Sequence, residues 1–179
     1  MEKWTNVVIH HSASDFGNAR LIDQWHKQRG WTGIGYHFII LNGRPIAEWK
    51  TPITPLIGSI EVGRMINDNI WVEKNEIGAH TLGFNKNSIG ICLIHKTKFY
   101  IQQFISLYNL CKFFSEFFII QPENFYGHYE LDKNKPDCPG FDMVVFRKLL
   151  KREITKNEFI KYLVENKKIY ETETKDVFF

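Results

Sequence analysis

The chain has 179 residues, enough for one domain with a substantial core and too few for two domains of ordinary size. Its composition, 44% hydrophobic and 24% charged, is that of a folded globular protein, and a net charge of +3 does not by itself indicate a nucleic-acid binder. No apolar run approaches the roughly eighteen residues that a membrane span needs, so we expect no membrane insertion.

The N-terminal residues, MEKWTNVVIHHSAS, lack the basic and then apolar segments of a secretory signal, so we expect synthesis in a cytoplasm. The chain has three cysteines, an odd number that cannot all pair, and a reducing compartment favours free thiols. Cys92 and Cys111 lie in apolar stretches and are expected to be buried. Cys138 differs from both, because it lies in a polar loop beside Pro139 and Gly140.

Strands and helices alternate along most of the chain. Continuous β-branched and apolar runs predict buried strands at residues 6–11 (NVVIHH), 35–41 (GYHFIIL) and 88–94 (SIGICLI). Apolar residues at helical spacing predict helices at 18–29 and 101–118. This alternation predicts an α/β domain with a mixed sheet.

A last core helix is expected after Asp142, which would cap it, with apolar positions at Val144, Val145, Leu149 and Leu150. Residues 151–179 are rich in Lys and Glu. There, TKNE at Thr155 predicts a capping box, and the apolar stripe consists of Phe159, Tyr162 and Leu163. We therefore predict one domain over residues 1–150, followed by a helical extension and tail over 151–179.

Four side chains suggest a metal site. His10 and His11 end the first predicted strand, and His128 and Cys138 lie in a loop before the last core helix. Neutral imidazole and thiolate are good zinc ligands, and three protein ligands with a fourth position for water are typical of catalytic zinc. Alternation along a strand turns only one of His10 and His11 toward a cleft. By spacing alone the signal is weak, and a cysteine nucleophile at Cys138 with His128 as its base is an alternative.

Five blocks of sequence resemble, in order, those of the zinc-dependent N-acetylmuramoyl-L-alanine amidases: VVIHHSAS, QWHKQRGW, GYHFII, GAHTLGFNKNSIGICLI and GHYEL…CPGFD. These type 2 amidases share a fold with peptidoglycan recognition proteins and include the phage lysozyme-type amidases. The blocks cover most of residues 5–150. The resemblance implies a single domain with a central mixed sheet flanked by helices, and a zinc ion in a groove on one face.

Residue by residue, the resemblance implies that His10, His128 and Cys138 are the zinc ligands. It implies that Tyr36 assists catalysis beside the metal, and that His80 and Asn85 contribute to substrate binding.

We expect structural roles for the remaining histidines. If His10 binds the metal, His11 faces away from it. We expect His26 at an exposed helix position and His37 as a packed imidazole, and His95 carries no motif.

The chain departs from the family pattern at one position. Many members carry a catalytic Lys two residues before the third ligand, where this chain has Pro136. Lys135 is displaced by one residue, in a loop longer than that of compact phage members. We take Lys135 as the candidate ahead of Lys133, the alternative being a solvated loop lysine without a role.

Residues 43–78 contain three prolines and little periodicity, so we expect a long and partly irregular excursion. Within it, IEVGR at residues 60–64 resembles a strand of the amidase family, which would make residues 43–59 an insertion relative to that family. An insertion beside a binding groove could shape substrate choice.

The function implied by the resemblance is hydrolysis of the amide bond between N-acetylmuramic acid and L-alanine, in peptidoglycan or muropeptides, by a monomer. An endolysin-like enzyme would act on the wall after holin-dependent release, whereas a recycling amidase would act in the cytoplasm. A non-catalytic peptidoglycan-binding module is the alternative, because recognition proteins of this fold commonly lose the Cys ligand.

Overall fold

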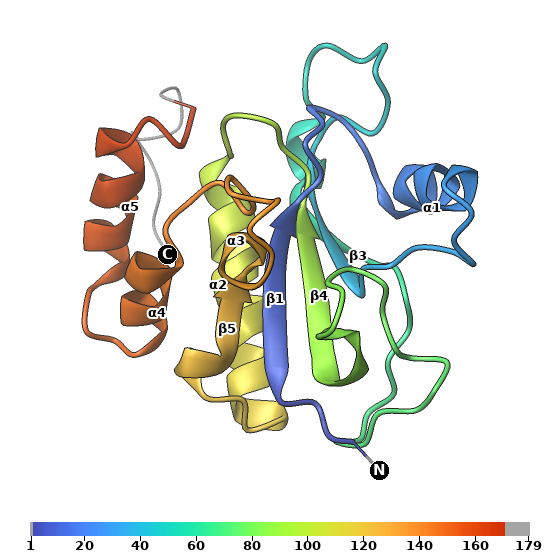
Figure 1. The fold of residues 1–179 in the computed structure, drawn as a ribbon. Helices are drawn as coiled ribbons and strands as arrows, with labels where there is room; N and C mark the ends of the chain where they lie inside the picture. The colour runs from blue at the N-terminus through green and yellow to red at the C-terminus, as the bar shows by residue number, and fades with distance from the viewer. Residues whose placement is uncertain (1, 171–179) are drawn as a thin grey trace.

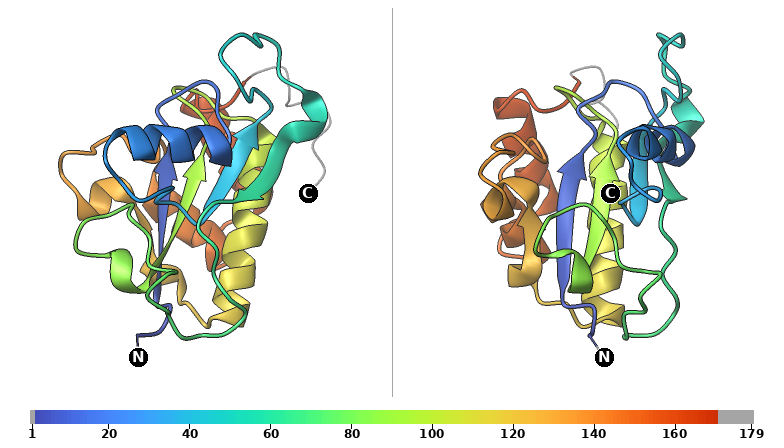
Figure 2. Two further views of the ribbon diagram at one scale, coloured as in Figure 1. Left: turned by 90° about the vertical axis from the view of Figure 1, so that its right-hand side faces the viewer. Right: turned by 45° about the vertical axis from the view of Figure 1, so that its right-hand side comes forward.

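The computed structural model describes residues 2–170 as three layers, with a β-sheet between two groups of helices (Figure 1, Figure 2). The sheet in these residues has five strands: β1 Asn6–His11, β2 Phe38–Asn42, β3 Ile57–Val62, β4 Ser88–Leu93 and β5 Phe125–Gly127. Their order in space is β3-β2-β4-β1-β5, with β3 antiparallel to β2 and all other neighbours parallel. The predicted α/β fold with a mixed sheet is confirmed.

The helices cover the two faces of the sheet unequally. Helices α2 (Ile101–Phe117), α4 (Met143–Leu150) and α5 (Lys156–Glu165) lie on one side, and α1 (Ala19–Gln28) lies alone on the other (Figure 2). The short helix α3 (His128–Leu131) directly follows β5. Because β1 and β4 are covered on both faces, their sequences are continuous apolar runs rather than alternating ones.

Two hydrophobic cores result, one on each face. The larger core joins Val7 and Ile9 of β1 to buried aromatic rings of α2, α4 and α5, including Phe104, Phe146 and Phe159. The smaller core, on the α1 face, contains Ile22, Ile34, Ile39, Leu41, Cys92 and Ile94. His10 is paired in register with Cys92, so its side chain lies on the α1 face.

The strand predictions differ from the structure at two points. β2 begins at Phe38 rather than at Gly35. The Gly35 carbonyl accepts the Ala79 N–H at 3.0 Å instead, and the two backbones lie so close that a Cβ would not fit. β3 begins at Ile57, so part of the segment predicted as an insertion belongs to the sheet. Antiparallel pairing with β2 includes Ile57, across an irregularity in register that periodicity in the sequence does not reveal.

The caps predicted at Asp142 and Thr155 are confirmed, and Asn18 adds one that was not predicted. Asn18 accepts a hydrogen bond from the Leu21 N–H at 2.8 Å at the start of α1. Asp142 does the same for the Val144 N–H at 2.7 Å, and Thr155 and Glu158 form the expected capping box. The prediction that Val144 contributes to the core is wrong, because it is 51% exposed on the outer face of α4.

Helix α5 packs onto the larger core. The Phe159 ring is 1% exposed and lies 5.6 Å from the ring of Phe104 and 5.7 Å from that of Phe146, measured between centroids. Leu163 is fully buried beside it. Residues 171–179 of the predicted tail lie outside the described residues. No helix within residues 2–170 has the length and apolarity to span a bilayer.

Removal of the Phe159 ring tests how far α5 supports the domain. We expect Phe159→Ala to lower the free energy of unfolding by about 3–5 kcal/mol, since it leaves a cavity among three helices. Val164→Ala on the same helix alters a side chain that is 42% exposed and is expected to change stability by no more than about 0.5 kcal/mol. Urea unfolding followed by circular dichroism measures both. A loss for Phe159→Ala as small as that for Val164→Ala would show that α5 contributes little to the stability of the core.

Candidate metal centre

The register of the sheet brings two histidines together. In β5, Gly127 is paired with Ile9 of β1, so His128, the next residue, emerges beside His10. The centroids of the two imidazole rings are 4.4 Å apart. Both side chains are buried, at 1% exposure for His10 and 8% for His128. The sheet therefore holds two nitrogen donors side by side at its carboxyl edge.

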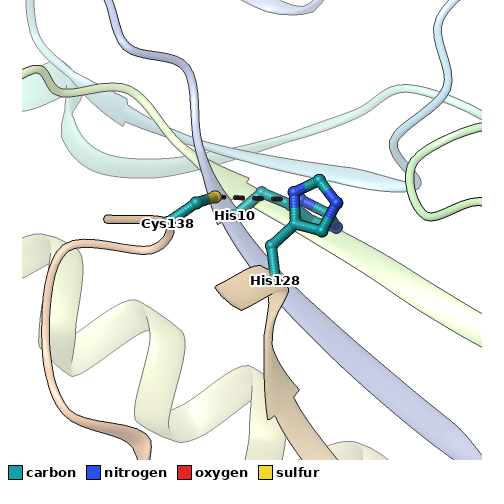
Figure 3. A group of neighbouring side chains, drawn as sticks. All are labelled: His10, His128 and Cys138. Carbon is teal, nitrogen blue, oxygen red and sulfur yellow. Dashed lines mark hydrogen bonds between the residues drawn. The ribbon is translucent and has the colours of Figure 1, made fainter. Parts of the chain in front are cut away.

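Cys138 joins this pair through hydrogen bonds of the main chain. Its Sγ accepts the backbone N–H of His11 at 3.3 Å, and its carbonyl accepts the N–H of Tyr129 at 2.9 Å. The Sγ then lies 4.0 Å from Nδ1 of His10, and Figure 3 shows the thiol and both imidazoles converging from three segments. One ligand atom from each of the three residues lies within 4.8 Å of the others.

The donor set fits zinc. Two imidazoles and a thiol are a common combination for Zn²⁺, which prefers nitrogen and sulfur in tetrahedral geometry. With Zn–N near 2.0–2.1 Å and Zn–S near 2.3 Å, tetrahedral angles place donors roughly 3.3–3.6 Å apart. The donors here lie somewhat farther apart, at 4.0 Å between Cys138 Sγ and His10 Nδ1 and within 4.8 Å for all three, so they would move slightly toward a bound ion. Three protein donors leave a fourth position open.

Burial keeps the triad neutral when no metal is bound. It lowers the pKa of His10 well below its ordinary value, with the nearby His80 and His128 adding to the effect. Burial also lowers the pKa of His128 and raises that of the Cys138 thiol to about 12. Neutral imidazoles are the ligand form, whereas the thiol must lose its proton on binding a metal.

A cavity of about 410 Å³ opens beside the triad, and most of the predicted site residues line it. Its described lining consists of His26, Arg29, Trp31, Tyr36, Ala79, His80, Thr81, Leu82, Asn85, His128, Asp132 and Lys135. Lys133 is absent from this lining, which comes from residues 26–36, 79–85 and 128–135. Within residues 2–170, the lining of this cavity includes no residue of the excursion at 43–78, and the role of that excursion beside a groove stays a prediction.

Tyr36 lies between the triad and the cavity. Its ring centroid is 5.1 Å from that of His10. Burial raises the pKa of the Tyr36 hydroxyl well above its ordinary value, and the Cys92 and Cys138 sulfurs add to the shift. The hydroxyl therefore keeps its proton at neutral pH and can donate a hydrogen bond to a ligand.

His80 and Asn85 belong to a turn that packs behind His10. Asn85 Oδ1 accepts the backbone N–H groups of His80 and Thr81, at 2.9 and 2.8 Å. The His80 ring is held between two partners, with Nδ1 3.1 Å from Nε2 of His10 and Nε2 3.2 Å from the Ser88 carbonyl. Both residues thus line the cavity and also make hydrogen bonds within the protein.

The prediction for His26 is wrong. Its side chain is buried, accepts the Gly35 N–H on Nδ1 at 3.0 Å and packs against the rings of Trp31 and Tyr36. The sequence does contain a signal, because His26 follows the buried Ile22 by four residues on the same helix face.

His37 is a packed imidazole, as expected. Its Nδ1 accepts the Gly90 N–H at 2.8 Å, and its Nε2 donates to the Glu76 carbonyl at 2.8 Å. Sequence reasoning gave no role to Arg29, Trp31 and Asp132, although the first two lie in the block QWHKQRGW.

Comparison with known proteins gives a family and several relatives. The family profile described as N-acetylmuramoyl-L-alanine amidase matches residues 1–141. The endolysin of Escherichia phage T7 is 35% identical over 91 residues, or 49% of this chain and 46% of that protein. The endolysin of Klebsiella phage KP32 is 32% identical over 97 residues, or 52% of this chain and 49% of that protein. The chain spans about half the length of the curated relatives it matches.

Solved structures show the same architecture over a larger share of the chain. N-acetylmuramoyl-L-alanine amidase LysC from Clostridium intestinale URNW is similar with a TM-score of 0.63 and 25% identity, covering 86% of this chain and 88% of that one. Wild-type PGRP-LB of Drosophila is similar with a TM-score of 0.58 and 25% identity, covering 83% of this chain and 81% of that one.

Buried histidines predict how stability depends on pH, and His26, His37, His80 and His95 all lie outside the triad with lowered pKa values. Burial lowers the pKa of His37 to about 4 and that of His95 to about 3, from an ordinary 6.5. Below pH 6.5 the unfolded chain binds protons at these positions that the folded chain does not, so stability is full above pH 6.5 and falls toward pH 4. We expect a loss of up to about 1.4 kcal/mol per pH unit for each histidine.

Urea unfolding of the metal-free protein at about pH 7, 6 and 5 measures this loss. A free energy of unfolding that stays constant over that range would contradict the burial of neutral imidazoles at His37 and His95.

Proposed function

Because the chain belongs to the N-acetylmuramoyl-L-alanine amidase family, we propose that it is a zinc-dependent hydrolase that cleaves the amide bond between N-acetylmuramic acid and L-alanine in peptidoglycan. The observation that carries the proposal is the buried His10–His128–Cys138 triad at the wall of a cavity large enough for part of a muropeptide. The three donors would hold the metal. A zinc ion held by them supplies Lewis acidity and activates water near neutral pH.

The protein's own groups act on the amide carbonyl. Negative charge develops on that oxygen as water attacks, and a hydrogen-bond donor aimed at it stabilises the transition state. Tyr36, which lines the cavity and whose hydroxyl keeps its proton, is the donor that we assign. Lys135 brings a positive charge to the same cavity, despite its displacement by one residue from the family position.

The loop that carries Lys135 has a defined conformation. The Lys135 N–H donates to the Asp132 carbonyl at 3.0 Å, and the Lys135 carbonyl accepts the Cys138 N–H at 3.1 Å. These two turns direct Lys135, rather than its neighbour Lys133, into the lining of the cavity. We therefore assign Lys135 the role that the family gives to the lysine before the third ligand.

The proposed biological role is that of a cell-wall lytic enzyme, as the phage endolysins among its relatives suggest. A recycling amidase that acts on soluble muropeptides would use the same site. A binding module without catalysis is disfavoured because all three donors and Tyr36 are present together. A cysteine hydrolase is disfavoured because burial raises the pKa of the Cys138 thiol to about 12, which leaves little thiolate.

The proposal predicts a specific set of products. Incubation of purified peptidoglycan with the protein is expected to release stem peptides that begin at L-alanine and to leave the glycan strands intact. Mass spectrometry identifies the products, and a zinc chelator is expected to abolish their release. Cys138→Ala should lose zinc and activity together, since it removes one of three donors.

An active Cys138→Ala protein that contains no metal would overturn the zinc mechanism. Release from soluble muropeptides but not from intact wall would identify a recycling enzyme, whereas silence on both substrates would favour the binding module.

The two loop lysines form a matched pair for a second test. We expect Lys135→Ala to lower kcat by roughly tenfold or more, because it removes a positive charge from the cavity that receives the developing oxyanion. Lys133→Ala, in the same exposed loop but outside the cavity lining, is expected to leave kcat within about twofold of the wild type. Initial rates on a soluble muropeptide compare them. Equal rates for both variants would remove Lys135 from the mechanism.

A further inference from the structure

A chain of hydrogen bonds runs from the main chain of β4 to the metal centre through two imidazoles. It consists of the Ser88 carbonyl, the His80 ring and the His10 ring, with contacts of 3.2 and 3.1 Å. We infer that His80 is a positioning residue, which fixes His10 in the tautomer whose Nδ1 is free to bind the metal. This inference rests on the proposed zinc site.

The donors and acceptors in this series of hydrogen bonds are fixed at Ser88. A backbone carbonyl only accepts hydrogen bonds, so Nε2 of His80 must carry the proton that it donates there. The Ser88 hydroxyl also lies 3.4 Å from this nitrogen, and its own proton goes to the Phe84 carbonyl at 2.6 Å. Both groups near Nε2 of His80 therefore act as acceptors.

The next link follows from the single N–H of a neutral imidazole. With Nε2 protonated, Nδ1 of His80 has a lone pair that faces Nε2 of His10 at 3.1 Å. If Nε2 of His10 also lacked a proton, two lone pairs would face each other in a buried site. A proton on Nε2 of His10 removes that repulsion and also suits the Thr81 hydroxyl, whose oxygen lies 3.4 Å from Nε2 of His10 and 3.2 Å from Nδ1 of His80.

The last link reaches the metal centre. With its proton on Nε2, His10 has a lone pair on Nδ1, and this is the nitrogen that lies 4.0 Å from Cys138 Sγ. Figure 3 shows the side chains of the triad gathered at this point. Metal-bound histidines generally donate their other N–H to a partner that fixes the ring, and here that partner is a second histidine.

The fold is built to hold His80 in this place. Its backbone N–H is bound by Asn85 Oδ1, and its ring lies over Gly90 of β4, where a Cβ would come within 2.6 Å of the ring. Both ring nitrogens of His80 have partners inside the protein, so neither is left for a substrate. His80 thus acts through His10, which is a different role from the substrate binding that the family resemblance implies.

Nitrogen-15 NMR of the imidazoles in the metal-free protein tests the proposed tautomers of His10 and His80 directly. We expect His10 and His80 both to carry their proton on Nε2, and the Nδ1 resonance of His10 to shift when zinc is added. A proton on Nδ1 of His10 in the metal-free protein, or zinc bound through its Nε2, would overturn the inference. This measurement needs no variant and no activity.

Two substitutions at His80 test the effect on the metal. His80→Leu removes the acceptor and is expected to raise the zinc Kd by about 10–100-fold. His80→Asn keeps an oxygen acceptor near the position of Nδ1 and should retain affinity closer to that of the wild type. Competition with a chromophoric chelator measures Kd, and thermal unfolding without zinc checks that each variant folds.

The outcomes separate this inference from the proposed function. Equal zinc affinity in the wild type and in a folded His80→Leu variant would overturn the positioning role and leave the zinc hydrolase standing. A wild-type protein that binds no zinc would overturn the proposed function instead, while the tautomers in the metal-free protein would still decide the hydrogen-bond chain.

Discussion

The main-chain pairing of β1 with its two parallel neighbours, β4 and β5, decides which side chains meet at the carboxyl edge of the sheet. β5 ends at Gly127, opposite Ile9, so that His128 is turned toward His10 at the start of α3. A slip of one residue in β1 would exchange the two faces and turn His11 toward the cavity in place of His10. Two of the three donors therefore depend on backbone hydrogen bonds in the most buried part of the molecule. The third donor is tied to the same strand, because Cys138 Sγ accepts the His11 N–H.

Around the triad the protein maintains a polar interior with little charge. Burial lowers the pKa values of His10, His37 and His80, so these rings lie together as neutral groups. Backbone carbonyls, rather than carboxylates, receive the protons of His37 and His80. A divalent cation held by the triad would meet oriented dipoles and one thiolate among its ligands, with the Asp132 carboxylate 3.9 Å from Nε2 of His128. The three donors alone would leave it a net positive charge, and a centre that retains positive charge polarises a carbonyl more strongly than a neutral one.

Much of this arrangement could be predicted from the sequence, and the exceptions share a cause. The predictions of strands at 6–11 and 88–94 and of a helix at 101–118 agree with the structure to within one residue, because these local patterns are long and consistent. The start of β2 and the burial of His26 depend instead on contacts between separate segments of the chain. Gly35 illustrates this, since it lies outside β2 with its backbone directly against that of Ala79, and its N–H donates to the His26 ring. The bonds of His80 are likewise visible only once β4 and the turn at 80–85 are placed against β1.

The bond from the Tyr129 N–H to the Cys138 carbonyl has a consequence for how this family can diversify. It closes the loop between the second and third donors at its base, so the spacing of the donors does not depend on how many residues the loop contains. Changes in length within the exposed residues 133–137 are then expected to leave the triad in place. Such a loop can vary in evolution, or be exchanged in the laboratory, as a module that brings new side chains to the cavity above an unchanged metal centre.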